Sequence, residues 1–215
     1  GRVKGPFYGG KKEMYDKTMA SEKLRKWQKQ LFTIMTGDKQ ELLRDRKVIL
    51  IQDSCGNTGK SWFQKWLRVG QKKLVVRSLP VSSVERLISA VHILNKSMNV
   101  DLYVVDFTRT RGDSQSYEDL FSAIEQIKNG QVIDVMYGKY NEAIFKPPMI
   151  AIFTNEKFSN FEKFLSADRW QAYSLNVNQV LSQINTDGTF TPLDLLKNNE
   201  GPAETEPKGG CQTER

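Results

Sequence analysis

Residues 54–61, with the sequence SCGNTGKS, combine the residue types that bind the phosphates of a nucleotide. Such loops follow the pattern G-x-x-x-x-G-K-[ST], in which the second glycine lets the backbone amides curl around a phosphate. Here that glycine is Gly59, Lys60 can contact the β and γ oxygens, and the Ser61 hydroxyl can coordinate Mg²⁺. The other candidate nucleotide-binding residues precede them in the loop: Gly56, Asn57 and Thr58.

The first glycine of this pattern is missing, because Ser54 stands at its position. Gly56 could supply the backbone freedom that the turn needs. The loop has the expected surroundings, since an apolar run of strand length precedes it and a helical pattern follows it. The alternative is a strand-to-helix turn that contains GKS by coincidence. The surroundings favour a phosphate loop with a serine at its first position.

Two polar residues at the ends of other predicted strands could complete such a site. Asp106 closes the apolar run LYVVD, where an acid would help to anchor Mg²⁺, although an ordinary strand-end cap is the alternative. Asn155 follows the run MIAIFT and could sense the γ-phosphate, although Thr-Asn is equally an ordinary turn opener. Many ATPases carry a glutamate directly after the first acid. That residue is Phe107 here, so the sequence identifies no catalytic base.

The elements that would position these residues alternate between strands and helices. Apolar runs predict strands at 47–52, 74–77, 102–106, 149–153 and from 170. Helical spacing predicts helices from Ser21 to Gly37, after Lys60, from Ser82 and over 117–128. A β-hairpin is expected over 131–146, with its turn near Gly138. This alternation predicts an α/β fold with a mostly parallel sheet covered on both faces.

Composition restricts the partners and the compartment. The chain has 215 residues, a net charge of +7 and a pI near 9.3, which favours nucleic acid over membrane, with a merely basic soluble surface as the alternative. Cys55 and Cys211 lie far apart, so no structural disulfide is expected and an intracellular compartment fits. The longest apolar run, at 149–153, is too short to span a bilayer. His92, the only histidine, lies inside a predicted helix and is expected to be structural.

The order of these motifs resembles the helicase half of replication-initiator (Rep) proteins of circular single-stranded DNA viruses, the circovirus-like group of helicase superfamily 3. The similarity covers roughly residues 20–180 and rests on GNTGKS, YVVDFTR, IEQIKNG with GKY and KPP, MIAIFTN and LSADRW. It implies a three-layer P-loop NTPase of AAA+ type with a small N-terminal helical segment. It also implies ATP and Mg²⁺ as ligands, a homo-oligomeric ring, commonly a hexamer, around single-stranded DNA, and a location in the host nucleus.

The resemblance implies roles for individual residues at the nucleotide. Lys60 and Ser61 would contact ATP and Mg²⁺, and Asp106 would be the second Mg²⁺ anchor. Asn155 would be the sensor of the γ-phosphate. Arg169 would be an arginine finger, a cation that enters a neighbouring subunit's site, whereas the sequence alone favours a surface salt bridge.

The resemblance also implies a DNA contact and a division of the chain. The hairpin over 134–146 would be a pore loop, with Lys139 and Lys146 holding DNA phosphates. Four parts follow: a linker from an upstream nuclease domain at 1–19, a helical oligomerisation segment at 20–45, the ATPase domain at 46–180, and a C-terminal tail at 181–215, largely disordered after 197. No counterpart of the nuclease metal site or tyrosine is present in the sequence, so no DNA nicking is expected.

Three functions of different kinds remain open at this stage. The first is an ATP-driven DNA translocase, whose 3′-to-5′ direction comes from the resemblance. The second is an ATP-gated clamp or assembly module that encircles DNA with little hydrolysis, because the second acid is missing. The third is a small-molecule kinase, which the basic charge and the lysine-bearing hairpin disfavour.

Overall fold

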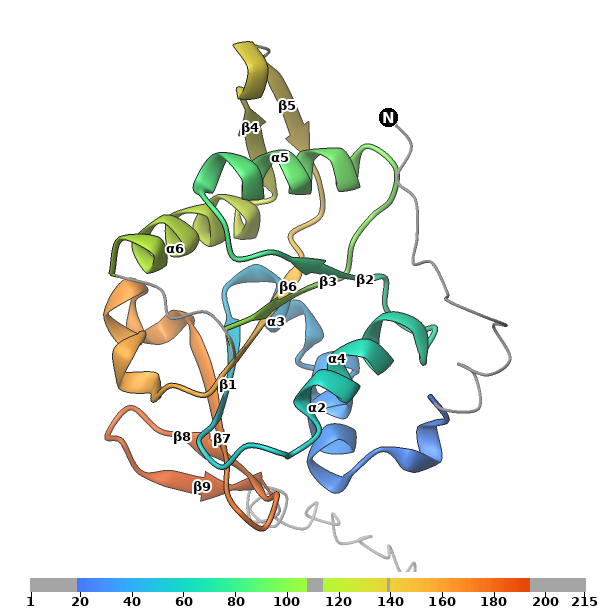
Figure 1. Cartoon of the computed structure of the whole chain (residues 1–215), viewed down its shortest axis with the longest axis vertical. Coiled ribbons are helices and arrows are strands. Elements are labelled where there is room, and N and C mark those ends of the chain that lie inside the picture. Colours follow the sequence, from blue (N-terminus) through green and yellow to red (C-terminus); the bar gives the residue numbers. More distant parts are fainter. Residues whose placement is uncertain (1–18, 108–113, 139, 194–215) are drawn as a thin grey trace, which may run out of the picture.

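The computed structural model describes residues 19–107, 114–138 and 140–193, and it is an α/β structure built on a sheet of seven strands (Figure 1). The strand order across this sheet is β2-β3-β6-β1-β7-β8-β9. Five neighbouring strands are parallel: β2 (Val76–Leu79), β3 (Leu102–Asp106), β6 (Met149–Thr154), β1 (Val48–Asp53) and β7 (Trp170–Leu175). Two antiparallel strands extend one edge: β8 (Leu181–Ile184) and β9 (Phe190–Pro192). The expectation of an α/β fold with a mostly parallel sheet is confirmed.

Helices cover both faces of the sheet (Figure 1). The α-helices are α2 (Lys26–Thr36), α3 (Gln40–Asp45), α4 (Lys60–Val69), α5 (Val84–Asn95) and α6 (Ser114–Lys128). Short 3₁₀ turns are η1 (Ser21–Lys23), η2 (Met136–Gly138), η3 (Phe158–Asn160), η4 (Glu162–Phe164) and η5 (Ala167–Arg169). Within the described ranges, no helix has the length and apolar character needed to cross a bilayer.

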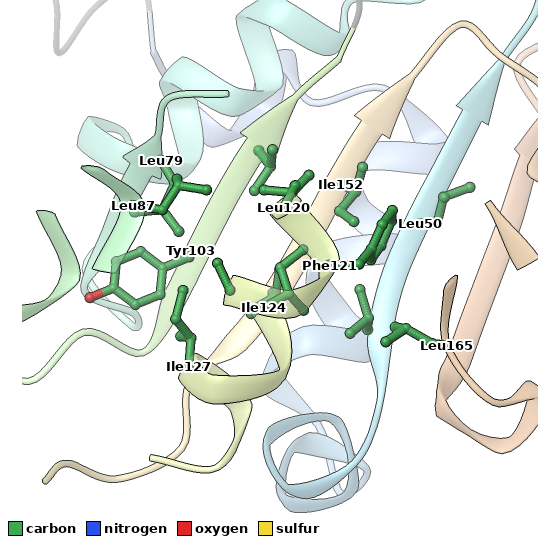
Figure 2. Packing of buried hydrophobic residues seen from close by; sticks show 14 of the residues in the cluster. Leu50, Leu79, Leu87, Tyr103, Leu120, Phe121, Ile124, Ile127, Ile152 and Leu165 are labelled. Carbon is green, nitrogen blue, oxygen red and sulfur yellow. The ribbon is translucent and has the colours of Figure 1, made fainter. Parts of the chain in front are cut away.

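The central strands are continuously apolar because each of their faces packs against a separate core. All six residues of β1 are buried. Val48 and Leu50 belong to a core that includes α5 and α6, whereas Ile49 and Ile51 belong to a second core that includes α2 and α4. In Figure 2, Phe121 of α6 lies beside Leu50 in the first of these cores, and Ile124 lies between Phe121 and Tyr103.

The first α-helix begins later than the sequence predicts. Ser21, the expected N-cap, lies in the 3₁₀ turn η1, and Leu24 has an extended backbone with φ −61° and ψ 130°. The helix α2 starts at Lys26 with Arg25 as its N-cap. The physical reason is a local bond, since the Gln28 side chain accepts the backbone N–H of Arg25 at 2.8 Å and satisfies an amide at the helix start.

The segment expected to begin a C-terminal tail instead completes the sheet as far as residue 192. Residues 181–184 pair antiparallel with β7, and residues 190–192 pair with β8. Leu181 and Leu193 are buried in the second core, which gives this segment an apolar reason to pack. The expected disorder after 197 lies outside the described residues.

The β-hairpin expected over 131–146 is present as β4 (Gln131–Asp134) and β5 (Asn141–Ile144). Gly138 has φ +69° at its turn, and the hairpin projects from the end of the molecule beyond α5 (Figure 1). Asp134, at the end of β4, accepts bonds from Ser89 and lies 3.1 Å from His92 Nδ1. The structural role expected for His92 is therefore confirmed, since it joins α5 to the end of β4, next to the turn of the hairpin.

Lys128, the last residue of α6, is buried and lacks a hydrogen-bonded carboxylate among the contacts that the structure gives it. Its ammonium donates to the carbonyls of Leu43, Arg44 and Pro148, which ties α6 to the end of α3. Burial lowers the pKa of this lysine to about 7.

The stability of the protein should therefore rise with pH between about 7 and 10. In that window the unfolded chain holds a proton on Lys128 that the folded chain lacks, so the free energy of unfolding increases by up to about 1.4 kcal/mol per pH unit. Urea unfolding of the wild type and of Lys128→Met at several pH values measures this slope. The variant should lose it, whereas Lys96→Met, an exposed lysine after α5, should keep it. Equal slopes in all three proteins would contradict the prediction.

Candidate nucleotide-binding site

The loop from Ser54 to Gly59 joins the buried strand β1 to the start of α4. Three of its residues have left-handed backbone: Gly56 at φ +71°, Asn57 at φ +54° and Gly59 at φ +86°. Ser54 is not among the positive-φ residues. A serine is compatible with this position because the turn places its left-handed conformations further along the loop.

Asp53, the last residue of β1, holds this loop together from inside. Its carboxylate accepts the backbone N–H groups of Cys55 and Gly56, each at 3.1 Å, and the Thr58 hydroxyl at 2.5 Å. Asp53 is fully buried. Burial alone would raise the pKa of Asp53, but the Thr58 hydroxyl and the Lys60 ammonium outweigh it and hold the pKa below its ordinary value. The loop is therefore fixed by an ionised carboxylate.

Lys60 begins α4 and turns its side chain inward, where it is 8% exposed. Its Nζ lies 3.2 Å from Asp53 Oδ2 and donates to the carbonyl of Thr154 at 3.4 Å and to Oδ1 of Asn155. The ends of β1 and β6 therefore converge on one ammonium. The structure thus brings together the lysine and the asparagine that the sequence marks as site residues.

Asp106 lies at the carboxyl end of β3, on the same side of the sheet as the loop. Its Oδ2 accepts a hydrogen bond from Gln64 Nε2 at 3.0 Å, and Gln64 lies one turn after Lys60 on α4. Ser61 is exposed on the first turn of that helix. A hydroxyl and a carboxylate on adjacent elements fit Mg²⁺, which takes one or two protein oxygens and completes its shell with phosphates and waters.

Phe107 stands where a second acid is usual. Its side chain points away from the carboxyl ends of the strands and into the first core. Its ring contacts Tyr117 at 5.3 Å and Phe161 at 5.8 Å between centroids. The hydroxyl of the same Tyr117 donates to Glu156 Oε1 at 2.6 Å, and Asn160 Nδ2 donates to Oε2 at 3.1 Å. A carboxylate held in a fixed orientation thus follows Asn155 directly and lies beside the aromatic group that contains Phe107.

Arg169 lies at the amino-terminal ends of the parallel strands, whereas the loop of its own chain lies at their carboxyl ends. It precedes Trp170, which pairs with Val48, the first residue of β1, whereas the loop follows Asp53, the last. Five residue steps along β1 separate the two ends of the strand, a distance of about 16 Å. The guanidinium donates to Glu125 at 3.0 Å, the kind of salt bridge that the sequence alone favoured. Within one chain Arg169 cannot reach the loop.

The two lysines proposed to hold DNA are only partly described. Lys139 lies outside the described residues. Lys146 follows β5 at the base of the hairpin, is 62% exposed, and forms an ion pair at 3.1 Å with Glu41 of α3. The structure therefore places Lys146 beside the protein body.

A cavity of about 940 Å³ lies over β1, β7 and β8, away from the loop. Its lining includes side chains of mixed character: Lys47, Gln52, Phe158, Trp170, Gln183 and Phe190. The loop residues, Asp106 and Asn155 do not line it. The site is therefore defined by the polar side chains at the carboxyl edge of the strands, where ligands bind in open parallel sheets.

Sequence reasoning did not identify Asp53 or Glu156 as parts of the site. Asp53 stands directly before the loop, and its own signal was a buried-strand run ending on an acid, the same signal that marked Asp106. Glu156 has no such local signal, because only the packing of α6 against the end of β6 gives it Tyr117 as a partner.

No protein-family model matches this chain, and no curated protein matches it either.

Proposed function

We propose that this chain is a P-loop nucleoside triphosphatase that binds ATP with Mg²⁺. The observation that carries the proposal is the position of Lys60, a buried ammonium at a helix N-terminus, enclosed by a left-handed loop and adjacent to Asn155. A phosphate binds favourably where loop amides, a lysine and a helix N-terminus converge. Within this class, we infer an AAA+-type helicase of superfamily 3, the motor half of a replication initiator of circular single-stranded DNA viruses.

Each residue of the site has a task that its contacts support. Lys60 would exchange Asp53 for the β and γ oxygens of the nucleotide, since both partners are anionic. Asn155, already within hydrogen-bonding distance of Lys60, would monitor the γ-phosphate. Bound Mg²⁺ would neutralise phosphate charge, with the Ser61 hydroxyl and the Asp106 carboxylate as its protein contacts.

DNA binding is proposed for the hairpin of β4 and β5. It projects from the end of the molecule opposite the loop (Figure 1). Its tip region carries Tyr140, which is 68% exposed. An exposed aromatic ring can stack on a nucleobase, and the neighbouring Lys139 can bind backbone phosphate without regard to sequence. In a ring of subunits, such hairpins would line a central channel.

Steady-state ATP hydrolysis, measured with and without single-stranded DNA, tests the proposed motor. Protein concentration should span subunit assembly, and heparin should replace DNA as a polyanion control. Turnover should rise with DNA, rise with protein concentration, and stay low with heparin. Hydrolysis that is indifferent to both DNA and concentration would contradict a DNA motor and favour a small-molecule kinase.

A DNA-encircling clamp is the second candidate, and Phe107 is the observation that favours it. The position of the usual second acid is filled by a ring buried among aromatic side chains, so it offers no base for the attacking water. The clamp predicts ATP-dependent assembly on DNA without turnover. Sedimentation with ATP, together with the hydrolysis assay, separates it from the motor.

Glu156→Gln should lower kcat about 100-fold if this carboxylate orients the attacking water in place of the missing acid. The substitution keeps the size of the side chain and leaves an oxygen for the Tyr117 hydroxyl, so Mg-ATP affinity should change little. Glu162→Gln, an exposed acid in the same region, is the matched control. Unchanged turnover in Glu156→Gln would exclude Glu156 from the reaction.

A further inference from the structure

The start of α2 donates hydrogen bonds to three consecutive carbonyl groups of the phosphate loop. Arg25 Nη1 donates to the carbonyl of Asn57 at 3.1 Å, and Trp27 Nε1 donates to that of Thr58 at 3.1 Å. Gln28 Nε2 donates to the carbonyl of Gly59 at 3.2 Å. Each pair is separated by about thirty residues in the sequence, so these contacts exist only in the folded chain.

These bonds control which way the loop amides face. In a planar trans peptide unit the carbonyl and the N–H point in opposite directions. Holding the carbonyls of residues 57–59 toward α2 therefore directs the N–H groups of residues 58–60 away from α2. A concave surface of such N–H groups is the arrangement that binds an anion.

The helix is also packed closely against the loop. A methyl group built on Gly59 would lie 3.1 Å from Gln28 Nε2 and 3.3 Å from the Arg25 guanidinium. Trp27 is fully buried and meets Phe63 of α4 edge-to-face at 5.2 Å between centroids. Arg25 also donates to Gln179 in the β7–β8 turn at 3.0 Å. The end of the loop at Thr58 and Gly59 is thus packed against α2, whereas residues 54–57 are exposed.

We propose that the N-terminus of α2 is a positioning element of the nucleotide site, in which Arg25, Trp27 and Gln28 hold the phosphate loop in its binding conformation. This inference rests on the proposed nucleotide function. It gives the segment before the sheet a second role besides the oligomerisation expected for it. A shift of α2 on subunit assembly would change nucleotide affinity without any new contact to the nucleotide.

Trp27→Phe tests the proposal because it removes one donor and keeps a buried aromatic ring. The structure supplies a matched control in Trp66→Phe, since Trp66 is equally buried and its Nε1 has no hydrogen-bond partner among the described residues. Gln28→Met is a second variant, which keeps length and helix propensity but removes both the donor to Gly59 and the acceptor of the Arg25 backbone N–H. Far-ultraviolet circular dichroism and a thermal melt would verify that all three variants fold.

Two measurements read the effect. Hydrogen–deuterium exchange of the peptide covering residues 55–61, without nucleotide, should be faster in Trp27→Phe and Gln28→Met than in wild type and Trp66→Phe. The Kd for Mg-ATP and for inorganic tripolyphosphate should rise about fivefold in Trp27→Phe, the size expected for one lost hydrogen bond, and at least as much in Gln28→Met, which loses two. Equal loss for both ligands assigns the effect to phosphate binding.

The outcomes separate the inference from the proposed function. If Trp27→Phe and Trp66→Phe show the same exchange and the same Kd, the positioning role is overturned even though nucleotide binds. If wild-type protein binds neither Mg-ATP nor tripolyphosphate, the proposed function fails. Exchange then decides the inference alone, because faster exchange in Trp27→Phe retains the control of the loop by α2 and equal exchange overturns it.

Discussion

Lys60→Ala should lower ATP turnover about 1,000-fold and abolish measurable Mg-ATP binding. A buried cation that meets a developing negative charge is among the largest single contributions to such a site. The ammonium of Lys60 is buried and joins Asp53 to the end of β6, whereas the nearby Arg25 guanidinium bonds to a carbonyl of the loop. Isothermal titration with Mg-ATP and steady-state hydrolysis measure the two losses.

Stability needs a separate control, because this substitution leaves Asp53 buried without its countercharge. The double variant Asp53→Asn with Lys60→Ala removes that charge and should recover much of the lost stability while it still fails to bind nucleotide. Lys65→Ala, on the exposed side of the same helix, should bind as wild type does. Nucleotide binding by a folded Lys60→Ala variant would mean that the loop is not the phosphate site.

Arg169→Ala should lower kcat about 1,000-fold in the assembled protein, the effect expected for an arginine finger. Arg169 lies at the amino-terminal ends of the strands, far from the loop of its own chain, so it can contact only the site of a neighbouring subunit. The substitution also breaks the ion pair with Glu125, whose exposed carboxylate makes that pair worth less than about 1 kcal/mol. Glu125→Ala breaks the same pair, keeps the arginine, and is therefore the matched control.

Mixing two inactive variants gives the sharper test of this role. An equal mixture of Lys60→Ala and Arg169→Ala subunits contains interfaces where an intact Lys60 meets an intact Arg169. Random assembly through a heterologous interface would make about a quarter of the sites complete, so turnover should recover to about that fraction. No recovery in mixed assemblies, with both variants folded and assembled, would remove Arg169 from the site.

The sequence by itself determined the elements and the local chemistry of this protein. The buried runs at 48–53, 102–106 and 149–154 form strands, and the loop with Gly56 and Gly59 precedes a helix. These features are readable because continuous apolar runs, helical spacing and glycines at left-handed positions act over a few neighbouring residues. The parallel sheet follows from the alternation of such segments.

The tertiary structure alone decided which distant residues share the site and which do not. The order of strands placed Asn155, which follows an apolar run, beside Lys60. It placed Arg169, which precedes a similar run, at the opposite ends of the strands. The packing of α2 supplied the donors to the loop, and the pairing of β8 with β7 turned an expected tail into sheet. Contacts of this kind depend on strand order and on which helix face meets the sheet. No local pattern encodes them, because the partners lie tens of residues apart and are selected by the burial of the whole core.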